Sequence, residues 1–270
     1  MPATDLPLPP IDFMRRIGTP EENTISDYIQ VGELERKLVL DYLPDDWMSE
    51  GKRVLDFGSG AGGGLRHFVP ERDAGVELWG CDIHGPSVDW ASRNLAGFTF
   101  IQNSEAPPLA VPDGYFDLVY AVSVFTHITA HWADWLIELR RVLRPGGLLI
   151  ATVLGRSMFE MRVGEPFDDS KVGMMVLKPG RSWDAGGPLV FHSKWWLAAH
   201  WSPAFDLLRV DDDVVGRPTF SGAHGVVLGR RAVAEPSREA MTAPDPAEPR
   251  EAVAALENVR RLCLEIEASS

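Results

Sequence analysis

Short apolar runs alternate with helical patterns along most of the chain. Runs typical of buried strands stand at 53–57, 77–82, 98–101, 116–122, 148–153, 205–210 and 224–230. Apolar residues at helical spacing predict helices over 26–43, 86–95, 130–143 and 193–201, and a further helix that reaches Phe68 and stops before Pro70. This alternation predicts βαβ units. The expected fold class is therefore α/β, with a mostly parallel seven-stranded sheet flanked by helices.

The segments outside this alternation divide the chain further. We expect an N-terminal arm and helix over 1–48, and a main domain over 49–231 with a Gly- and Met-rich insertion at 155–190. Residues 232–249 are rich in Ala, Pro and Glu and predict a flexible linker. Residues 250–270 predict an amphipathic helix. Because so short a helix is marginal in water alone, it is expected to dock on its own domain or, as the favoured arrangement, on a second chain in a homodimer.

Composition narrows the classes of partner. The chain has 270 residues and a formal net charge of −13, which argues against binding to nucleic acid or to an anionic membrane surface. No apolar run has the length of a membrane span, and the N-terminus lacks a signal-peptide pattern, so a cytoplasmic protein is expected. Cys81 and Cys263 make neither a disulfide framework nor a zinc spacing, and no metal site is expected.

A glycine-rich loop follows the first strand of the main domain. It reads Asp56-Phe57-Gly58-Ser59-Gly60-Ala61-Gly62-Gly63-Gly64. Glycine lets a ligand approach the main chain closely. Asp82 ends the next strand, 19 residues after Gly63, where a carboxylate can accept hydrogen bonds from two ribose hydroxyls.

Two nucleotide ligands are compatible with this loop. Gly58, Gly60 and Gly63 satisfy the G-x-G-x-x-G pattern of NAD enzymes, so an oxidoreductase has to be weighed. Asp56 stands two positions before the first glycine, where it would repel a pyrophosphate but suits a ligand that carries an ammonium group. The loop therefore favours a cationic nucleoside ligand over a dinucleotide.

Three motifs in order carry a family resemblance. Val54–Gly62 resembles motif I of the class I S-adenosylmethionine-dependent methyltransferases, Phe116-Asp117-Leu118-Val119 resembles their strand-4 motif, and Leu139–Leu149 resembles the segment that leads into strand 5. The resemblance covers about 50–155 well and 193–230 loosely. It implies the Rossmann-like class I fold, S-adenosyl-L-methionine as cofactor and a small-molecule acceptor, as in the members associated with glycosyltransferases.

The resemblance also implies a set of cofactor-binding residues: Asp56, Gly58, Gly60, Asp82, Ile83, Asn103, Ser104 and Ala121. Asp56 and the two glycine backbones would hold the methionyl part, Asp82 the ribose, and Ile83 the adenine ring. Position 103 is Asn where the family often has an Asp bonded to the adenine amino group, and its carbonyl can accept the same bond. The backbone carbonyl near Ala121 would face the cofactor amino group.

Two histidines are candidates for catalysis. His127 follows the fourth strand, at the edge where methyl donor and acceptor should meet, and is a candidate base; a capping or packing role is the alternative. His192 is a second, weaker candidate. It precedes a helix with Trp195, Trp196 and Trp201, which would either wall a sugar or aromatic acceptor or fill the core.

Three readings of function follow. The first is an S-adenosylmethionine-dependent methyltransferase that methylates a hydroxyl of a sugar or a natural product. The second is a non-catalytic subunit with a methyltransferase fold that binds a partner. The third, carried by the glycine pattern alone, is an NAD-dependent oxidoreductase.

Overall fold

The computed structural model describes residues 5–16, 22–168, 172–182, 186–211 and 224–244. The helix predicted over 250–270, and with it the interface of the expected homodimer, lies outside the described residues. Part of the predicted linker, 245–249, lies outside them as well.

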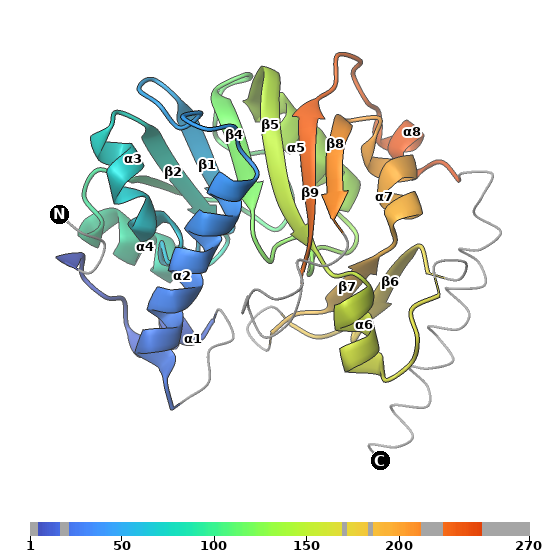
Figure 1. The fold of residues 1–270 in the computed structure, drawn as a ribbon, viewed down its shortest axis with the longest axis horizontal. Helices are drawn as coiled ribbons and strands as arrows, with labels where there is room; N and C mark the ends of the chain where they lie inside the picture. The colour runs from blue at the N-terminus through green and yellow to red at the C-terminus, as the bar shows by residue number, and fades with distance from the viewer. Residues whose placement is uncertain (1–4, 17–21, 169–171, 183–185, 212–223, 245–270) are drawn as a thin grey trace.

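One seven-stranded sheet organises the fold (Figure 1). Its strands are β1 (Arg53–Phe57), β2 (Glu77–Asp82), β3 (Thr99–Gln102), β4 (Phe116–Ala121), β5 (Leu143–Val153), β8 (Phe205–Asp211) and β9 (Gly225–Arg231). The order across the sheet is β3-β2-β1-β4-β5-β9-β8, and only β9 runs antiparallel to its neighbours β5 and β8. The predicted mostly parallel sheet is confirmed. Because the connections reverse direction between β1 and β4, the carboxyl ends of these two strands mark the place where ligands bind in open α/β sheets.

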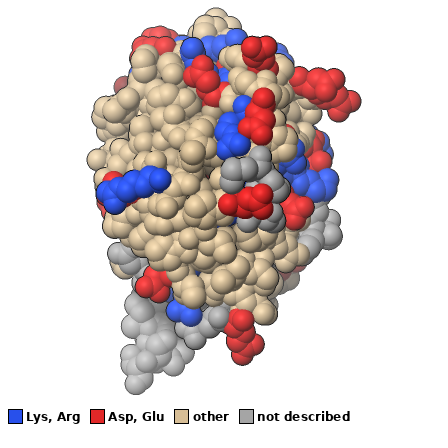
Figure 2. Space-filling model, turned by 90° about the vertical axis from the view of Figure 1, so that its left-hand side faces the viewer, with Lys and Arg blue, Asp and Glu red and all other residues tan. Residues whose placement is uncertain are grey.

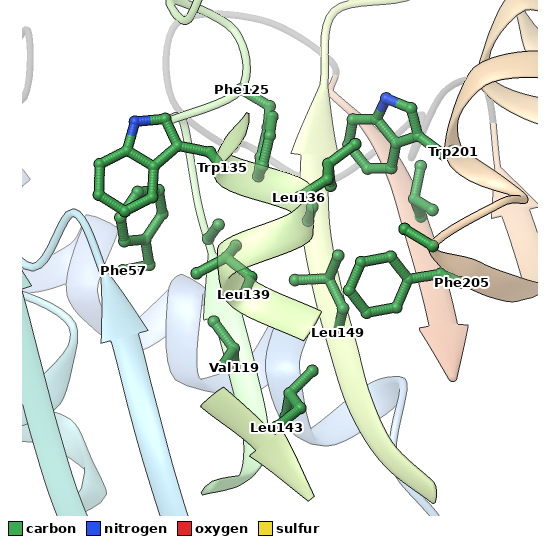
Figure 3. Close-up of a cluster of buried hydrophobic side chains, with 14 of the residues drawn as sticks. Phe57, Val119, Phe125, Trp135, Leu136, Leu139, Leu143, Leu149, Trp201 and Phe205 are labelled. Carbon is green, nitrogen blue, oxygen red and sulfur yellow. The ribbon is translucent and has the colours of Figure 1, made fainter. Parts of the chain in front are cut away.

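Helices cover both faces of the sheet. They are α2 (Thr24–Asp41), α3 (Val69–Asp73), α4 (Gly85–Asn94), α5 (Trp132–Val142) and α7 (Lys194–Trp201), and the short α1 (Ile11–Arg15) packs on α2. Alternate residues of a strand point to opposite faces, so Val54 packs under α2 and α4 while Leu55 packs with α5 and α7. Figure 3 shows the second of these layers, where Trp135, Leu136 and Leu139 of α5 lie on the strands.

Two predicted boundaries differ from the structure. The helix expected to stop before Pro70 instead continues from a 3₁₀ turn (Leu65–Phe68) into α3, with Pro70 in the first turn of α3. Proline is tolerated there because that position needs no backbone N–H donor. The fifth strand starts at Leu143, before the expected residue 148.

The insertion forms a small unit of its own. It contains α6 (Arg156–Val163) and the hairpin-like pair β6 (Met174–Leu177) and β7 (Leu189–His192), around a separate apolar cluster. The amide of His192 donates to the carbonyl of Leu154, 2.9 Å away, just after β5 ends. The insertion is therefore joined to the carboxyl edge of the sheet.

Residues 232–244 do not form the flexible linker predicted for 232–249. They include α8 (Arg238–Thr242), whose Met241 is fully buried. The Arg140 guanidinium donates to the carbonyls of Ala232, Val233 and Ala234. Composition predicted flexibility because the segment is rich in Ala, Pro and Glu, but a single large apolar side chain and one buried arginine attach it to α5.

Side chains of both charges are mixed on one side of the molecule. On the side of the molecule where α3 and α4 lie, basic and acidic side chains stand next to one another (Figure 2). Among the described residues no helix is both long and apolar enough to cross a membrane, and no three His, Cys, Asp or Glu residues gather as metal ligands would.

Candidate functional site

The glycine loop is tied to the carboxyl end of β2. The amides of Gly58 and Ser59 donate to the carbonyl of Cys81, at 2.8 and 2.9 Å. The amide of Gly60 donates to Oδ2 of Asp82 at 2.8 Å. None of the hydrogen bonds among the described residues uses the carbonyl oxygen of Gly58 or Gly60. These two carbonyls are therefore the backbone groups that the loop offers to a ligand with donors.

Gly58 and Gly60 differ in the space that surrounds them. A Cβ atom at Gly58 would lie 2.3 Å from the side chain of Val124, so packing excludes a larger residue. At Gly60, whose φ is +53°, a Cβ would meet no atom within 4 Å. The main chain at Gly60 thus borders open space, as close approach of a ligand requires.

Helix α2 covers the other side of the loop. A Cβ at Gly32 would lie 2.2 Å from the carbonyl oxygen of Gly63, and one at Gly64 would lie 2.0 Å from the Glu35 carboxylate. Part of the glycine-rich run therefore lets α2 sit directly on the loop. That contact brings Glu35 to the site, which the sequence analysis missed. Tyr28, Gly32 and Glu35 are spaced four and three residues apart, so helical periodicity places them on one face and could have identified the contact.

Three carboxyl groups surround the loop: Asp56, Glu35 and Asp82. The Asp56 side chain is 2% exposed, and its Oδ2 has no hydrogen-bond partner among the described residues. Burial, reinforced by the nearby Glu35 and Asp82 carboxylates, raises the pKa of Asp56 well above its usual value. Burial also raises the pKa of Glu35 to about 8. A cation placed here would favour the ionised forms, whereas a pyrophosphate would meet like charge.

Asp82 and Asn103 lie together at the ends of β2 and β3. The Asp82 carboxylate accepts the amides of Gly60 and His84, at 2.8 and 2.7 Å, and the Asp82 carbonyl accepts the amide of Asn103 at 3.1 Å. The Asn103 side chain donates to the carbonyl of Ser104, while its Oδ1 is buried without a partner. An orphaned acceptor at this place is available to a donor such as an exocyclic amine. Ile83 directly follows β2 and is partly buried.

The end of β4 completes this edge. Ala121 is fully buried, and Tyr120 pairs with Asp56 across the sheet. Directly after it, Ser123 has a positive φ of 59°, and its amide donates to the Thr152 hydroxyl on β5 at 2.7 Å. The chain therefore turns sharply where it leaves the sheet and enters the segment that carries the histidine candidate.

His127 contacts the insertion. Its Nδ1 lies 2.7 Å from the carbonyl oxygen of Pro188. A carbonyl only accepts hydrogen bonds, so Nδ1 carries the proton and Nε2 of the neutral ring is left as an acceptor. Burial lowers the pKa of His127, which keeps the ring neutral near pH 7. The arrangement suits a general base as well as a packing contact.

A second histidine lies near His127 and was missed by the sequence analysis. His224 is 4% exposed, and burial, together with repulsion from His127 once that ring is protonated, lowers the pKa of His224 to about 4. It immediately precedes β9, which runs antiparallel to β5 from Gly225 opposite Val153. The start of β9 therefore lies at the carboxyl edge of the sheet. Nothing in the sequence pattern indicated that β9 runs antiparallel, so the position of His224 at this edge was not predicted.

His192 belongs to an aromatic cluster. It is 4% exposed, its ring centroid lies 5.2 Å from that of Trp196, and burial lowers its pKa to about 3. Trp196 and Trp201 are themselves buried in the core, so they pack against the sheet. Of the two roles expected for these tryptophans, a wall of the acceptor site or core packing, the structure shows core packing for Trp196 and Trp201. His192 and His127 share no hydrogen bond or ring contact within the described part of the chain.

The loop differs from a dinucleotide site in its local structure. After Gly64 the chain forms a 3₁₀ turn, and a short α-helix begins only at Val69. The amides of Gly58, Ser59 and Gly60 are already used within the protein. These three amides are therefore not available to a pyrophosphate, which binds free amides at a helix N-terminus.

Residues 55–151 match the protein family described as a methyltransferase domain. A fatty-acid O-methyltransferase of Mycolicibacterium smegmatis is 38% identical over 109 residues, which cover 38% of this chain and 37% of that one. A malonyl-[acyl-carrier protein] O-methyltransferase of Enterobacter lignolyticus is 32% identical over 161 residues, which cover 57% of this chain and 60% of that one. The chain thus matches less than two thirds of the length of these relatives.

Solved structures share the fold. An S-adenosylmethionine-dependent methyltransferase from Mesorhizobium loti superposes with a TM-score of 0.54 at 18% identity, over 72% of this chain and 96% of that one. The [4+2]-cyclase SpnF superposes with a TM-score of 0.58 at 18% identity, over 85% of this chain and 99% of that one. Because a cyclase is among these neighbours, the fold by itself does not decide the reaction.

Proposed function

Since this chain carries a domain of the class I S-adenosylmethionine-dependent methyltransferase family, we propose that the protein binds S-adenosyl-L-methionine and methylates an oxygen atom of a small molecule. The observation that carries the proposal is the set of three carboxyl groups around a loop that leaves Gly60 open. The ligand carries a sulfonium and an ammonium group beside one carboxylate, and such a site favours the two cationic groups.

The residues at the edge fit the cofactor part by part. The carbonyls of Gly58 and Gly60 would accept from the ammonium group, with Asp56 beneath them supplying negative charge. The Asp82 carboxylate has lone pairs left for ribose hydroxyls after accepting two amides. The unpaired Oδ1 of Asn103 would accept the adenine amino group. Ile83, Ser104 and Ala121 are proposed as lining residues on position alone.

Methyl transfer places few demands on the protein beyond alignment and a proton acceptor. When bound, the cofactor supplies a methyl group on a sulfonium sulfur, which an acceptor oxygen displaces. We assign His127 Nε2 to take the proton of an acceptor hydroxyl, while its Nδ1–H stays on the Pro188 carbonyl and fixes the ring. Because this bond joins His127 to the insertion, the ring would stand beside the acceptor hydroxyl and leave the path from the methyl carbon to the acceptor oxygen open. His192 is too deeply buried to titrate near neutral pH and is not assigned a catalytic step.

The acceptor is proposed more narrowly as a hydroxyl of a sugar or a natural product. The need for a base distinguishes a hydroxyl from a carboxylate, because a carboxylate is already ionised near neutral pH. Two relatives are named for the O-methylation of a fatty acid and of malonyl-[acyl-carrier protein], so carboxylic acids are the alternative acceptors to test against hydroxyls. We propose no nucleic-acid partner, given a net charge of −13, and we retain a homodimer through the C-terminal tail as a proposal.

Turnover with labelled cofactor tests this function. A panel of sugars, phenols and fatty acids is incubated with wild type and with His127→Asn. Label transfer to a hydroxyl that falls about 10²–10⁴-fold in the variant supports the base, whereas equal transfer to an acid by both proteins would assign a carboxyl acceptor. Tight cofactor binding with no transfer to any acceptor would favour the non-catalytic subunit or another reaction on the same fold.

A further inference from the structure

The loop between β3 and β4 is held by side chains of α5. Residues 103–115 contain no helix or strand, yet they begin with Asn103, the residue proposed to contact adenine. A segment without secondary structure needs other partners for its backbone groups. In this loop, side chains of one helix supply a large part of them.

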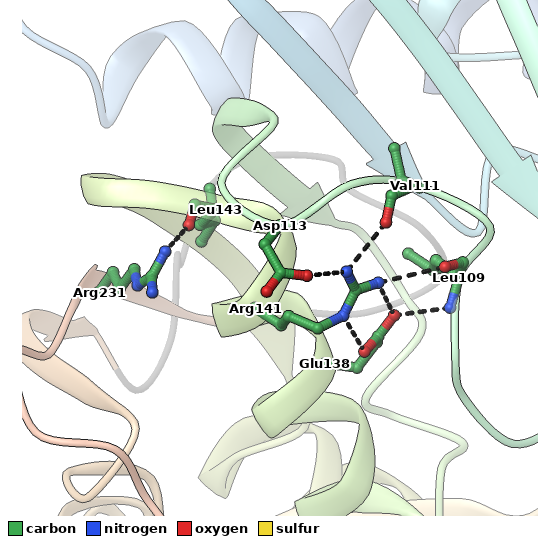
Figure 4. A network of polar contacts seen from close by, with 7 residues as sticks. All are labelled: Leu109, Val111, Asp113, Glu138, Arg141, Leu143 and Arg231. Carbon is green, nitrogen blue, oxygen red and sulfur yellow. Dashed lines mark hydrogen bonds and ion pairs between the residues drawn. The ribbon is translucent and has the colours of Figure 1, made fainter.

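Three residues of α5, spaced three apart, supply these partners (Figure 4 shows the two nearer the helix end). The Trp135 indole nitrogen donates to the carbonyl of Glu105 at 2.8 Å. The Glu138 carboxylate accepts the amide of Leu109 at 2.6 Å. Arg141 donates to the carbonyls of Leu109 and Val111, at 3.1 and 2.9 Å, and pairs with Asp113 at 2.6 Å.

The three residues also constrain one another. Arg141 meets Glu138 through two parallel hydrogen bonds, at 2.8 and 2.6 Å, a geometry that fixes both side chains. Glu138 is 5% exposed and Trp135 is 2% exposed, with the Trp135 ring packed against Phe57 of β1. The Arg141 side chain is 29% exposed and that of Glu138 is 7% exposed, so this bidentate pair is partly shielded from water and holds its partners more firmly than a fully exposed pair does.

We infer that Trp135, Glu138 and Arg141 are positioning residues for the cofactor: through the backbone of the 103–113 loop they place the Asn103 acceptor and so set the selectivity for adenine. The inference rests on the proposed function, because Asn103 has this role only if the cofactor binds there. None of the three side chains is assigned a contact with the cofactor. They act through the loop.

The readout is discrimination between two product analogues. S-adenosylhomocysteine carries an amino group that can donate to Asn103 Oδ1, and its hypoxanthine counterpart carries a carbonyl that cannot. Calorimetry on wild type should show a preference for adenine of about tenfold. In Glu138→Ala the preference should fall to about twofold, and Glu138→Gln should restore most of it because the amide oxygen still accepts from Leu109. Simple loss of stability would not change this ratio among folded molecules.

Matched variants on the same helix control for packing. Asp134→Asn alters an ion pair with Arg238, 2.9 Å long, that faces α8, and it should leave the ratio at the wild-type value. If Glu138→Ala does not fold, Trp135→Phe removes a single indole donor and should lower the ratio about two- to tenfold. Trp132→Phe, whose indole packs on Trp196, is its control.

Different results would refute the proposed function and the inference about the loop. Wild type that binds neither analogue would refute the proposed function, and the inference with it. Wild type that prefers adenine, with an unchanged ratio in folded Glu138→Ala and Trp135→Phe, would refute the inference and leave the methyltransferase proposal standing.

Discussion

Replacing Asp82 by alanine should weaken cofactor binding strongly. In the structure this carboxylate already accepts two backbone amides, at 2.8 Å from Gly60 and 2.7 Å from His84. Each carboxylate oxygen has two acceptor sites, so capacity remains for the two ribose hydroxyls. The substitution therefore removes the charged acceptor and, at the same time, the Gly60 bond to β2, while the bonds of Gly58 and Ser59 to the Cys81 carbonyl remain.

The magnitude follows from these bonds. Loss of a charge-assisted acceptor is worth about 1.5–3 kcal/mol, which raises the dissociation constant roughly 10- to 150-fold. The two orphaned amides add a separate cost to folding, about 0.5–1.5 kcal/mol each. Binding and stability must therefore be measured apart.

Titration calorimetry with S-adenosylhomocysteine and its 2′-deoxy analogue makes this separation. Wild type should prefer the hydroxylated ligand by about two- to tenfold, and Asp82→Ala should show nearly equal affinities for the two. Asp82→Asn, which keeps one acceptor oxygen, should lie between them. Equal affinity of wild type and Asp82→Ala for S-adenosylhomocysteine would remove Asp82 from the site.

Further predictions concern the base, the acidic cluster and the C-terminal part. His127→Asn should leave cofactor affinity unchanged, and because burial lowers the pKa of His127, wild-type turnover should be level from pH 7 to 8 and decline only below about 6.5, as a pH–rate profile will reveal. Cofactor affinity should rise from pH 6 to 8, since the ligand cation favours ionised Glu35, whose pKa is about 8; calorimetry on Glu35→Gln should give a flatter dependence. Met241→Ala should lower the free energy of unfolding by about 2–5 kcal/mol, measured by denaturant titration, because the side chain is fully buried. Deleting 245–270 should leave that free energy unchanged while halving the mass in solution; a constant mass on light scattering would exclude a dimer through the tail.

The acidic cluster also affects stability in a defined direction. The pKa of Glu35 rises from its usual 4.5 to about 8 in the folded protein. The folded state therefore binds more protons than the unfolded chain between these two values, and stability falls as pH rises through this window. Bound cofactor should oppose the fall, because its charge compensates the carboxylate.

The sheet could be predicted because its central strands are buried on both faces. Leu118, Val119 and Tyr120 are all fully buried, which gives the continuous apolar run that short parallel strands show. The loop residues Gly60 and Asp82 could be located because they directly follow such runs. Because parallel strands end at the same edge of a sheet, Gly60 and Asp82 could also be predicted to lie at one edge.

The features that were missed depend on contacts between distant segments. Glu35 reaches the loop only because Gly32 lets α2 approach the backbone of Gly63. His224 reaches the edge because β9 inserts antiparallel beside β5. Met241 is buried by α5 and α7, against the flexible character of its neighbours in sequence. Local periodicity can place such residues on one face of an element, but it does not say which distant segment that face will meet.

The most direct test of the account is the identity of the nucleotide that the folded protein binds. Thermal unfolding is followed with S-adenosylmethionine, with S-adenosylhomocysteine and with NAD, each at matched concentrations. A ligand at 100 times its dissociation constant adds about 2.7 kcal/mol, which for a domain of this size raises the melting temperature by roughly 5–10 °C. The account predicts this rise for the two sulfur nucleosides and none for NAD. Stabilisation by NAD alone, or by none of the three, would contradict it.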